Sequence, residues 1–155
     1  FFMGCYLLAM YKEIGEKHLS VSWIYNGRDM SFAENCVGLM INLLFINCEM
    51  NEEMSFEEYF RQVKNEVQSS LSGSTNNGYA FRNLLEEPVA CFQYRDMMSE
   101  KTNEYVCEMI ELPNPMFEPG FFWEFEVVNN VSDISVCCVY NNYYYEKGRL
   151  VTSFN

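Results

Sequence analysis

The side chains best able to do chemistry in this sequence are one histidine, seven cysteines and several neighbouring carboxylates. A Ser-His-Asp or Cys-His device needs an imidazole base, and His18 is the one histidine that can supply it. His18 follows an apolar helical stretch, so its position favours a contact with the helix end over catalysis. The adjacent glutamates Glu52-Glu53, Glu57-Glu58 and Glu86-Glu87 do not face each other on a helix and indicate a solvated surface. We therefore expect no catalytic residue in this chain.

The cysteines predict free thiols instead of disulfides or a metal site. They are Cys5, Cys36, Cys48, Cys91, Cys107, Cys137 and Cys138. Their number is odd, no pair has the Cys-x-x-Cys spacing, and most lie in apolar segments. Such a pattern is typical of buried thiols in a reducing cytoplasm, where the neutral thiol is favoured over the reactive thiolate. The sequence predicts no metal centre.

Asn42 interrupts the apolar run Val37 to Ile46, which has the composition of an interior strand covered on both faces. A side-chain amide inside such a strand must find partners, or it costs about 1–3 kcal/mol. Two interpretations stay open from the spacing. Asn42 is either a core amide that ties down a neighbouring loop or a polar group that lines a buried channel.

Four elements follow from periodicity in the first half of the chain. Phe1 to Lys17 has helical spacing, and Leu19 to Tyr25 alternates as a strand does before the turn residues Asn26-Gly27. The run with Asn42 is the next strand. Ser55 and Glu58 then form a capping-box pattern, which predicts a helix over 55–72 that Gly73 ends.

The second half predicts mainly strands. Val89 to Tyr94 follows Pro88, and Phe121 to Val127 forms a hairpin with Ile134 to Tyr140. Short helices are expected at Tyr79 to Leu85 and in the tail over 144–154. This order predicts an α/β or α+β fold with a mixed sheet flanked by helices. Its 155 residues are the size of a single domain.

The charge and hydropathy of the chain exclude several classes of partner. Asp and Glu number 22 against 10 Lys and Arg, a formal charge of −12 that disfavours nucleic acid and anionic lipid. The longest apolar stretch is too short to span a bilayer, and no basic leader precedes it, so we expect a cytoplasmic protein. Because the chain begins inside the apolar run Phe1-Phe2-Met3, we expect it to be cut from a longer polypeptide.

Four motifs resemble, in order, those of the condensation domains of nonribosomal peptide synthetases. The segment Val37 to Leu44 is similar to the family's glycine-x-phenylalanine-valine-asparagine segment, and Val21 to Arg28 to its strand ending in Gly-Arg. Asn76 to Phe81 resembles the His/Asn-Gln-Asp-Tyr/Val-Pro-Phe motif, and Tyr140-Asn141-Asn142 the Tyr-Asn pair that closes the last long strand. The ordered set covers roughly residues 1 to 150.

The resemblance implies a chloramphenicol-acetyltransferase-like fold of two lobes with a tunnel between them. Residues 1–155 would be the C-terminal lobe, inactive alone, and the catalytic His-His-x-x-x-Asp-Gly motif would lie on the absent N-terminal lobe. The domain would form amide bonds between acyl or peptidyl and aminoacyl thioesters. Both substrates would arrive on the phosphopantetheine arms of peptidyl carrier domains, so the lobe itself would bind no cofactor directly.

The same resemblance assigns five residues to the tunnel or the lobe interface. Asn42 and Gly38 would border the tunnel, and Gly38 would let a backbone or a pantetheine arm pass closely. Arg28 would anchor the lobe interface or a carboxylate, with a plain surface charge as the alternative. Tyr79 and Phe81 would lie at the interface, although packing of a loop against the core is the commoner role of such aromatics.

Two other functions remain open from the sequence. One is a lobe of a different acyltransferase of the same fold, which uses coenzyme A or another acyl donor. The other is a stand-alone acidic protein-interaction module with all its apolar faces closed. A lobe separated from its partner would expose an apolar surface able to pair two copies in a homodimer.

Overall fold

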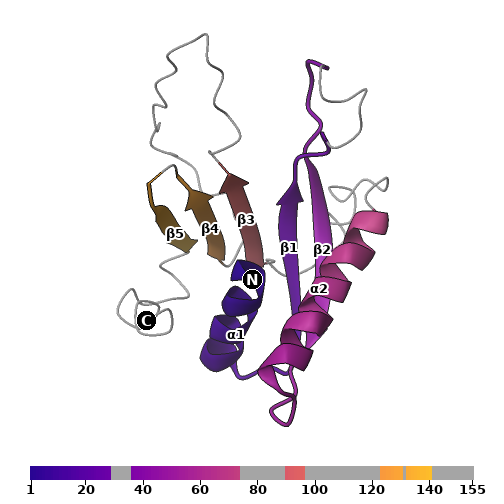
Figure 1. The fold of residues 1–155 in the computed structure, drawn as a ribbon, viewed down its shortest axis with the longest axis vertical. Helices are drawn as coiled ribbons and strands as arrows, with labels where there is room; N and C mark the ends of the chain where they lie inside the picture. The colour runs from indigo at the N-terminus through magenta and orange to yellow at the C-terminus, as the bar shows by residue number, and fades with distance from the viewer. Residues whose placement is uncertain (29–35, 74–89, 97–122, 131, 141–155) are drawn as a thin grey trace.

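The computed structural model describes residues 1–28, 36–73, 90–96, 123–130 and 132–140, and it contains two helices and five strands within these ranges (Figure 1). The elements follow the order α1, β1, β2, α2, β3, β4, β5 along the chain. The predicted helices at Tyr79 to Leu85 and over 144–154 lie outside the described residues, as does the polar loop expected after Gly73.

Helix α1, Phe2–Ile14, confirms the first predicted helix but ends earlier than Lys17. Gly15 adopts φ +80° and donates its N–H to Tyr11 O at 2.8 Å, a left-handed cap that glycine accommodates without strain. The helix buries Met3, Tyr6, Leu7 and Met10 along one face. His18 lies beyond this cap as the exposed first residue of β1, so the predicted contact of His18 with the helix end is wrong.

Helix α2, Phe56–Ser72, confirms the capped helix. The Ser55 hydroxyl accepts a hydrogen bond from Glu58 N–H at 3.3 Å, and the Glu58 carboxylate accepts one from Ser55 N–H at 2.9 Å. These two bonds satisfy helix donors that have no partner within the helix. The predicted end at Gly73 is also correct.

The five strands form one mixed sheet in the order β2-β1-β3-β4-β5. Their bounds are β1 His18–Tyr25, β2 Asn42–Glu49, β3 Ala90–Asp96, β4 Trp123–Asn129 and β5 Ile134–Tyr140. The outer pairs β1/β2 and β4/β5 are antiparallel, whereas β1/β3 and β3/β4 are parallel. An α+β architecture with a mixed sheet is therefore confirmed.

The register gives the residues that lie opposite each other in neighbouring strands. Eight residue pairs join β1 to β2, from His18 opposite Glu49 to Tyr25 opposite Asn42. Among the described residues, the parallel register of β1 and β3 runs from Val21 opposite Ala90 to Trp23 opposite Phe92. The hairpin β4/β5 confirms its prediction, and Asn130 N–H donates to Asp133 O at 2.8 Å in the turn.

Strand β2 differs from its prediction in both position and environment. It begins at Asn42, and the apolar residues 37–41 before it are not part of a strand. Among the described strands it also lies at an edge of the sheet, and its residues Asn47 and Glu49 are exposed, so the prediction of an interior strand covered on both faces is wrong. An uninterrupted apolar run suits several environments, and here its first half is exposed.

The core lies between the sheet and the two helices, which cover the same face of the sheet (Figure 1). Tyr6 of α1 stacks on Phe125 with ring centroids 5.0 Å apart and contacts Phe92 at 5.7 Å. Val21 and Ile46, paired across β1 and β2, are buried on the same side. Each such side chain contributes about 1.5–3 kcal/mol on burial, so this layer dominates stability.

No helix within the described residues is long and apolar enough to cross a membrane.

Candidate functional site

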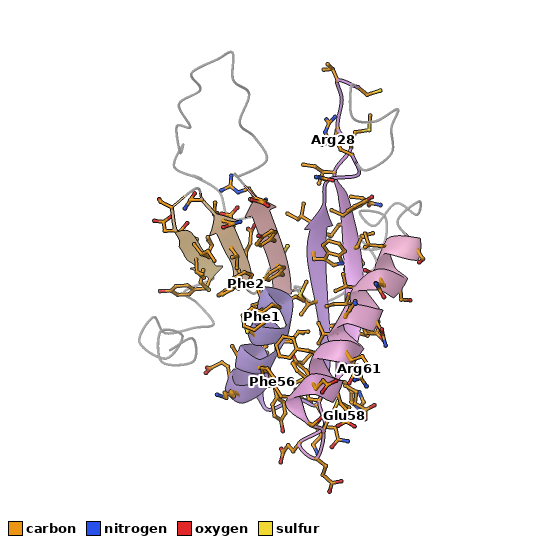
Figure 2. The ribbon with its side chains drawn as sticks, viewed as in Figure 1. Phe1, Phe2, Arg28, Phe56, Glu58 and Arg61 are labelled. Atoms are coloured by element: carbon orange, nitrogen blue, oxygen red, sulfur yellow. The ribbon has the colours of Figure 1, made fainter. Side chains whose placement is uncertain are left out.

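The connection between β1 and β2 places three of the predicted site residues at one end of the sheet. Here we call residues 36–41 the apolar projection. Val37 has an exposed fraction of 104%, Leu39 of 84% and Ile41 of 44%. Figure 2 shows the labelled Arg28 at this end of the molecule, far from Phe56 at the start of α2. An exposed apolar run of this kind is typical of a surface that another surface covers.

Arg28 fixes the path of the apolar projection. Its guanidinium donates from Nη1 to Cys36 O at 2.8 Å and from Nη2 to Gly38 O at 3.0 Å. Its own N–H donates to the side chain of Asn26 at 3.1 Å. Arg28 therefore joins the end of β1 to the segment that leads into β2, and it contacts the predicted site residue Gly38.

The backbone of the connection between β1 and β2 requires a glycine at position 27. Its φ is +65°, and a Cβ there would lie 2.4 Å from Met40 O. A Cβ at Gly38 would meet only Met40 Cε at 3.9 Å. The sequence predicts Gly27 as part of a turn and Gly38 as the position of close approach, whereas the close approach lies at Gly27. The Asn-Gly dipeptide was the available signal for Gly27.

Asn42 is the first residue of β2 and lies opposite Tyr25. Its side chain is half-buried, and its Oδ1 accepts a hydrogen bond from Leu43 N–H at 2.9 Å. It therefore does not lie in the middle of a buried strand, as the apolar run suggested. The structure places Asn42 at the junction between the apolar projection and the sheet.

The remaining two predicted residues, Tyr79 and Phe81, lie outside the described residues. The structure thus brings Arg28, Gly38 and Asn42 to one connection.

The six cysteines that the structure describes differ in burial: Cys48 and Cys91 are buried, and Cys138 is half-buried. Burial raises the pKa of Cys48 to about 11, with a further contribution from Glu66. Burial and the neighbouring Cys137 raise the pKa of Cys138 to about 11. Three other described cysteines are exposed, which corrects the expectation that these thiols are generally buried: Cys5, Cys36 and Cys137.

No group of three or more His, Cys, Asp or Glu side chains within the described part of the chain is arranged to hold a metal ion.

On the face of the sheet opposite the helices, β4 carries two carboxylates on the same side, Glu124 and Glu126. Burial is the main cause of the raised pKa of Glu124, and repulsion from the carboxylate of Glu126 is the smaller cause. Glu126 forms an ion pair with Arg95 of β3 at 2.6 Å. This is a partly exposed pair between neighbouring strands, and its distance matches an ordinary structural ion pair.

Comparison with known proteins places this arrangement in a known class of folds. No family model matches the sequence. The chain is 28% identical over 85 residues to gramicidin S synthase 2 from Brevibacillus brevis, and equally to that from Aneurinibacillus migulanus. That match covers 55% of this chain and 2% of the synthase.

Solved structures match the chain over almost its whole length. The condensation domain of the monacolin K polyketide synthase MokA gives a TM-score of 0.76 at 15% identity, covering 99% of this chain and 38% of that one. A four-domain nonribosomal peptide synthetase bound to AMP and glycine gives 0.74 at 13% identity, covering 97% and 13%. The acyl transferase PapA2 gives 0.68 at 11% identity, covering 98% and 36%.

The chain therefore has the fold of part of a condensation domain of the nonribosomal peptide and polyketide synthases, as the sequence motifs indicated. It spans little more than a third of the length of the MokA condensation domain that it matches.

Proposed function

We propose that this chain is the C-terminal lobe of a condensation domain and works only together with an N-terminal lobe. The observation that carries the proposal is the apolar projection, whose residues Val37 and Leu39 are almost fully exposed although Arg28 holds their backbone in place. The partial coverage of the condensation domains adds support, because a matching chain of this length leaves room for a second lobe.

The proposed reaction joins a carrier-bound acyl or peptidyl thioester to the amine of a carrier-bound aminoacyl thioester. The amine attacks the thioester carbonyl, an amide bond forms, and the carrier thiol leaves with a proton. Much of the barrier to such a reaction is overcome by holding the two reactants together. This lobe would supply acceptor-side and tunnel wall, and the basic imidazole would come from the N-terminal lobe.

Within this proposal Asn42 and Gly38 border the tunnel, and Arg28 anchors the lobe interface through the apolar projection. The hydrogen bonds from Arg28 to Cys36 and Gly38 support the anchoring role. Tyr79 and Phe81 keep the interface role that their motif implies. The phosphopantetheine arms belong to the carrier domains, and the chloramphenicol-acetyltransferase-like arrangement of the two lobes and the cytoplasmic location are part of the same proposal.

The apolar projection also provides the surface through which two copies of an isolated lobe would pair. In the complete domain that surface would be covered by the N-terminal lobe, and the homodimer would not form.

Replacement of Asn42 in the full-length protein tests the proposal. Asn42→Ala should slow condensation about tenfold, the equivalent of about 1.4 kcal/mol, with the fold retained. Single-turnover formation of the condensed product on loaded carrier domains, followed by mass spectrometry, measures the rate. Asn47→Ala is the matched control, because Asn47 lies on the same strand, is exposed and bonds only to the Ser20 hydroxyl among the contacts shown.

An unchanged rate for Asn42→Ala, or an equal loss in both variants, would contradict the tunnel role of Asn42.

A second candidate is an acyltransferase that takes its acyl group from another donor. The similarity to the acyl transferase PapA2 favours it, since that structure matches over 98% of this chain. The two functions differ in the donor. Single-turnover reactions of the full-length protein with acyl coenzyme A and with acyl-loaded carrier domain would separate them, because only the first donor supports turnover in a coenzyme A enzyme.

A further inference from the structure

Five aromatic rings form a continuous line over the helix-covered face of the molecule, and we call this line the aromatic ladder. Its rungs, from β3 to the start of α2, are Tyr94, Phe2, Phe1, Phe60 and Phe56. The ring centroids are 6.0, 5.4, 5.5 and 4.5 Å apart in that order. These separations lie within the range of favourable aromatic pairs.

Three rings of the aromatic ladder are exposed, and the other two, Phe2 and Phe60, are half-buried against the core. The exposed fraction is 77% for Phe1, 65% for Phe56 and 45% for Tyr94. Phe60 lies directly over Gly4, where a Cβ would be 2.6 Å from Phe60 Cε1. Single exposed apolar side chains are common, but a contiguous set of large rings marks an interaction surface. Because the rings already pack against one another, their side chains lose little further conformational entropy when a partner binds.

The lower end of the aromatic ladder is strongly acidic. Residues 49–58 contain five glutamates and no basic residue, and all five are exposed: Glu49, Glu52, Glu53, Glu57 and Glu58. Glu57 pairs with Arg61 at 2.6 Å, but both side chains are largely exposed, so the pair is well solvated. Figure 2 shows Phe56, Glu58 and Arg61 together at the end of the molecule opposite Arg28.

We propose that the aromatic ladder binds a basic peptide segment with apolar side chains. A Lys or Arg of the partner lies over the exposed ring of Phe56 among the carboxylates, where cation–π attraction and charge complementarity act together. Its apolar side chains lie along the rings toward Tyr94.

Charge also argues against the other occupants. A second copy docked on the aromatic ladder would bring the same five exposed glutamates to the interface. Like charges on two approaching surfaces oppose association. Anionic lipid and nucleic acid are disfavoured for the same reason.

Fluorescence anisotropy with labelled synthetic peptides tests the proposal on the full chain. The probe is a short peptide of Lys-Pro-Leu repeats, and the comparison peptides have Glu in place of Lys or Ser in place of Leu. We expect the Lys-Pro-Leu peptide to bind more tightly than both, with affinity that falls as salt is raised.

Two matched pairs of variants locate the binding. Phe56→Ala should weaken binding at least fivefold, whereas Ile134→Ala, which removes an apolar side chain 52% exposed on β5, should leave it unchanged. Glu57→Gln should weaken binding about twofold and reduce its salt dependence. Asp133→Asn removes the same charge from the hairpin turn and should have no effect. Circular dichroism confirms that each variant is folded.

Failure of the folded chain to bind the Lys-Pro-Leu peptide would overturn the proposal, as would equal binding of the Glu peptide or no effect of Phe56→Ala. Self-association that Phe56→Ala abolishes, without peptide binding, would assign the aromatic ladder to a second copy and also overturn it. The result is independent of the proposed condensation activity, because Phe56, whose replacement tests the proposal, lies at the opposite end of the molecule from Arg28.

Discussion

At the scale of single residues, Gly27 and Arg28 control the apolar projection by different means. Gly27 lets the backbone turn with φ +65° against Met40 O, and Arg28 binds the carbonyl groups of Cys36 and Gly38. The conformation of a strongly apolar and exposed segment is thus set by a backbone torsion and two hydrogen bonds instead of by burial.

Two glycine replacements should therefore differ sharply. Gly27→Ala should lower the free energy of unfolding by about 2 kcal/mol, because the left-handed backbone is strained for any L side chain and Met40 must move. Gly38→Ala should change it little, since the added Cβ meets only Met40 Cε. Urea unfolding followed by circular dichroism measures both, and equal losses would contradict the assignment.

The raised pKa values of Cys48 and Cys138 predict their reactivity. With pKa values of about 11 these two thiols are neutral at pH 8, so iodoacetamide should modify the exposed Cys5, Cys36 and Cys137 much faster. The folded state also keeps protons that the unfolded chain releases between pH 9 and 11, so stability should fall as pH rises through that window. Site-resolved mass spectrometry measures the modification.

Unfolding in urea provides the control, because it should make all these cysteines react alike. Rapid modification of Cys48 in the folded protein at pH 8 would contradict the prediction.

At the scale of elements, α2 was the most predictable part of the chain. Ser55 and Glu58 each accept a hydrogen bond from the backbone N–H of the other. The sequence pattern that predicts the start of the helix therefore lies within four residues. The bonds from the Ser55 side chain and backbone lower the pKa of Glu58. The carboxylate is therefore ionised through the neutral range, where it accepts both bonds.

Ser55→Ala should destabilise the protein by about 1 kcal/mol through loss of the cap. The matched control is Ser72→Ala at the other end of α2, where the hydroxyl donates to Gln68 O at 3.1 Å and caps no helix N–H, so its loss should matter less. Because the Glu58 pKa is lowered in the folded state, the difference between wild type and Ser55→Ala should shrink as pH falls through the carboxyl range. Thermal unfolding at pH 7 and pH 3.5 measures it, and a constant difference would argue against the box.

Other elements show why sequence patterns predicted only part of the fold. Strand β5 was predicted with its observed bounds, since turn residues precede it. The start of strand β2 was predicted wrongly. An apolar run does not indicate whether other residues of the chain will bury it, and here Val37 and Leu39 are exposed. The left-handed turn of Gly27 and the bonds from Arg28 depend on a backbone path that no local pattern specifies.

At the scale of the whole molecule, the sequence predicted a mixed sheet with helices but not the order of its strands. That order depends on the parallel pairing of Val21 with Ala90 and of Phe92 with Phe125, between segments far apart in the chain. Such pairings leave no periodic signal in either strand. Motif order was informative at this scale because it reflects a shared fold, which the solved condensation domains bear out.

The parallel pairing of β1 with β3 joins the β1/β2 pair to strands β3, β4 and β5 in one sheet. Helix α1 contacts both of these parts. Tyr6 packs on Phe92 of β3 and Phe125 of β4, and Gly4 O accepts a hydrogen bond at 2.7 Å from the hydroxyl of Tyr59 in α2, which packs on β2. Loosening α1 would therefore release two sub-assemblies, β1–β2–α2 and β3–β4–β5, each with its strand pairs intact. The packing of α1 therefore holds these two parts of the described fold together.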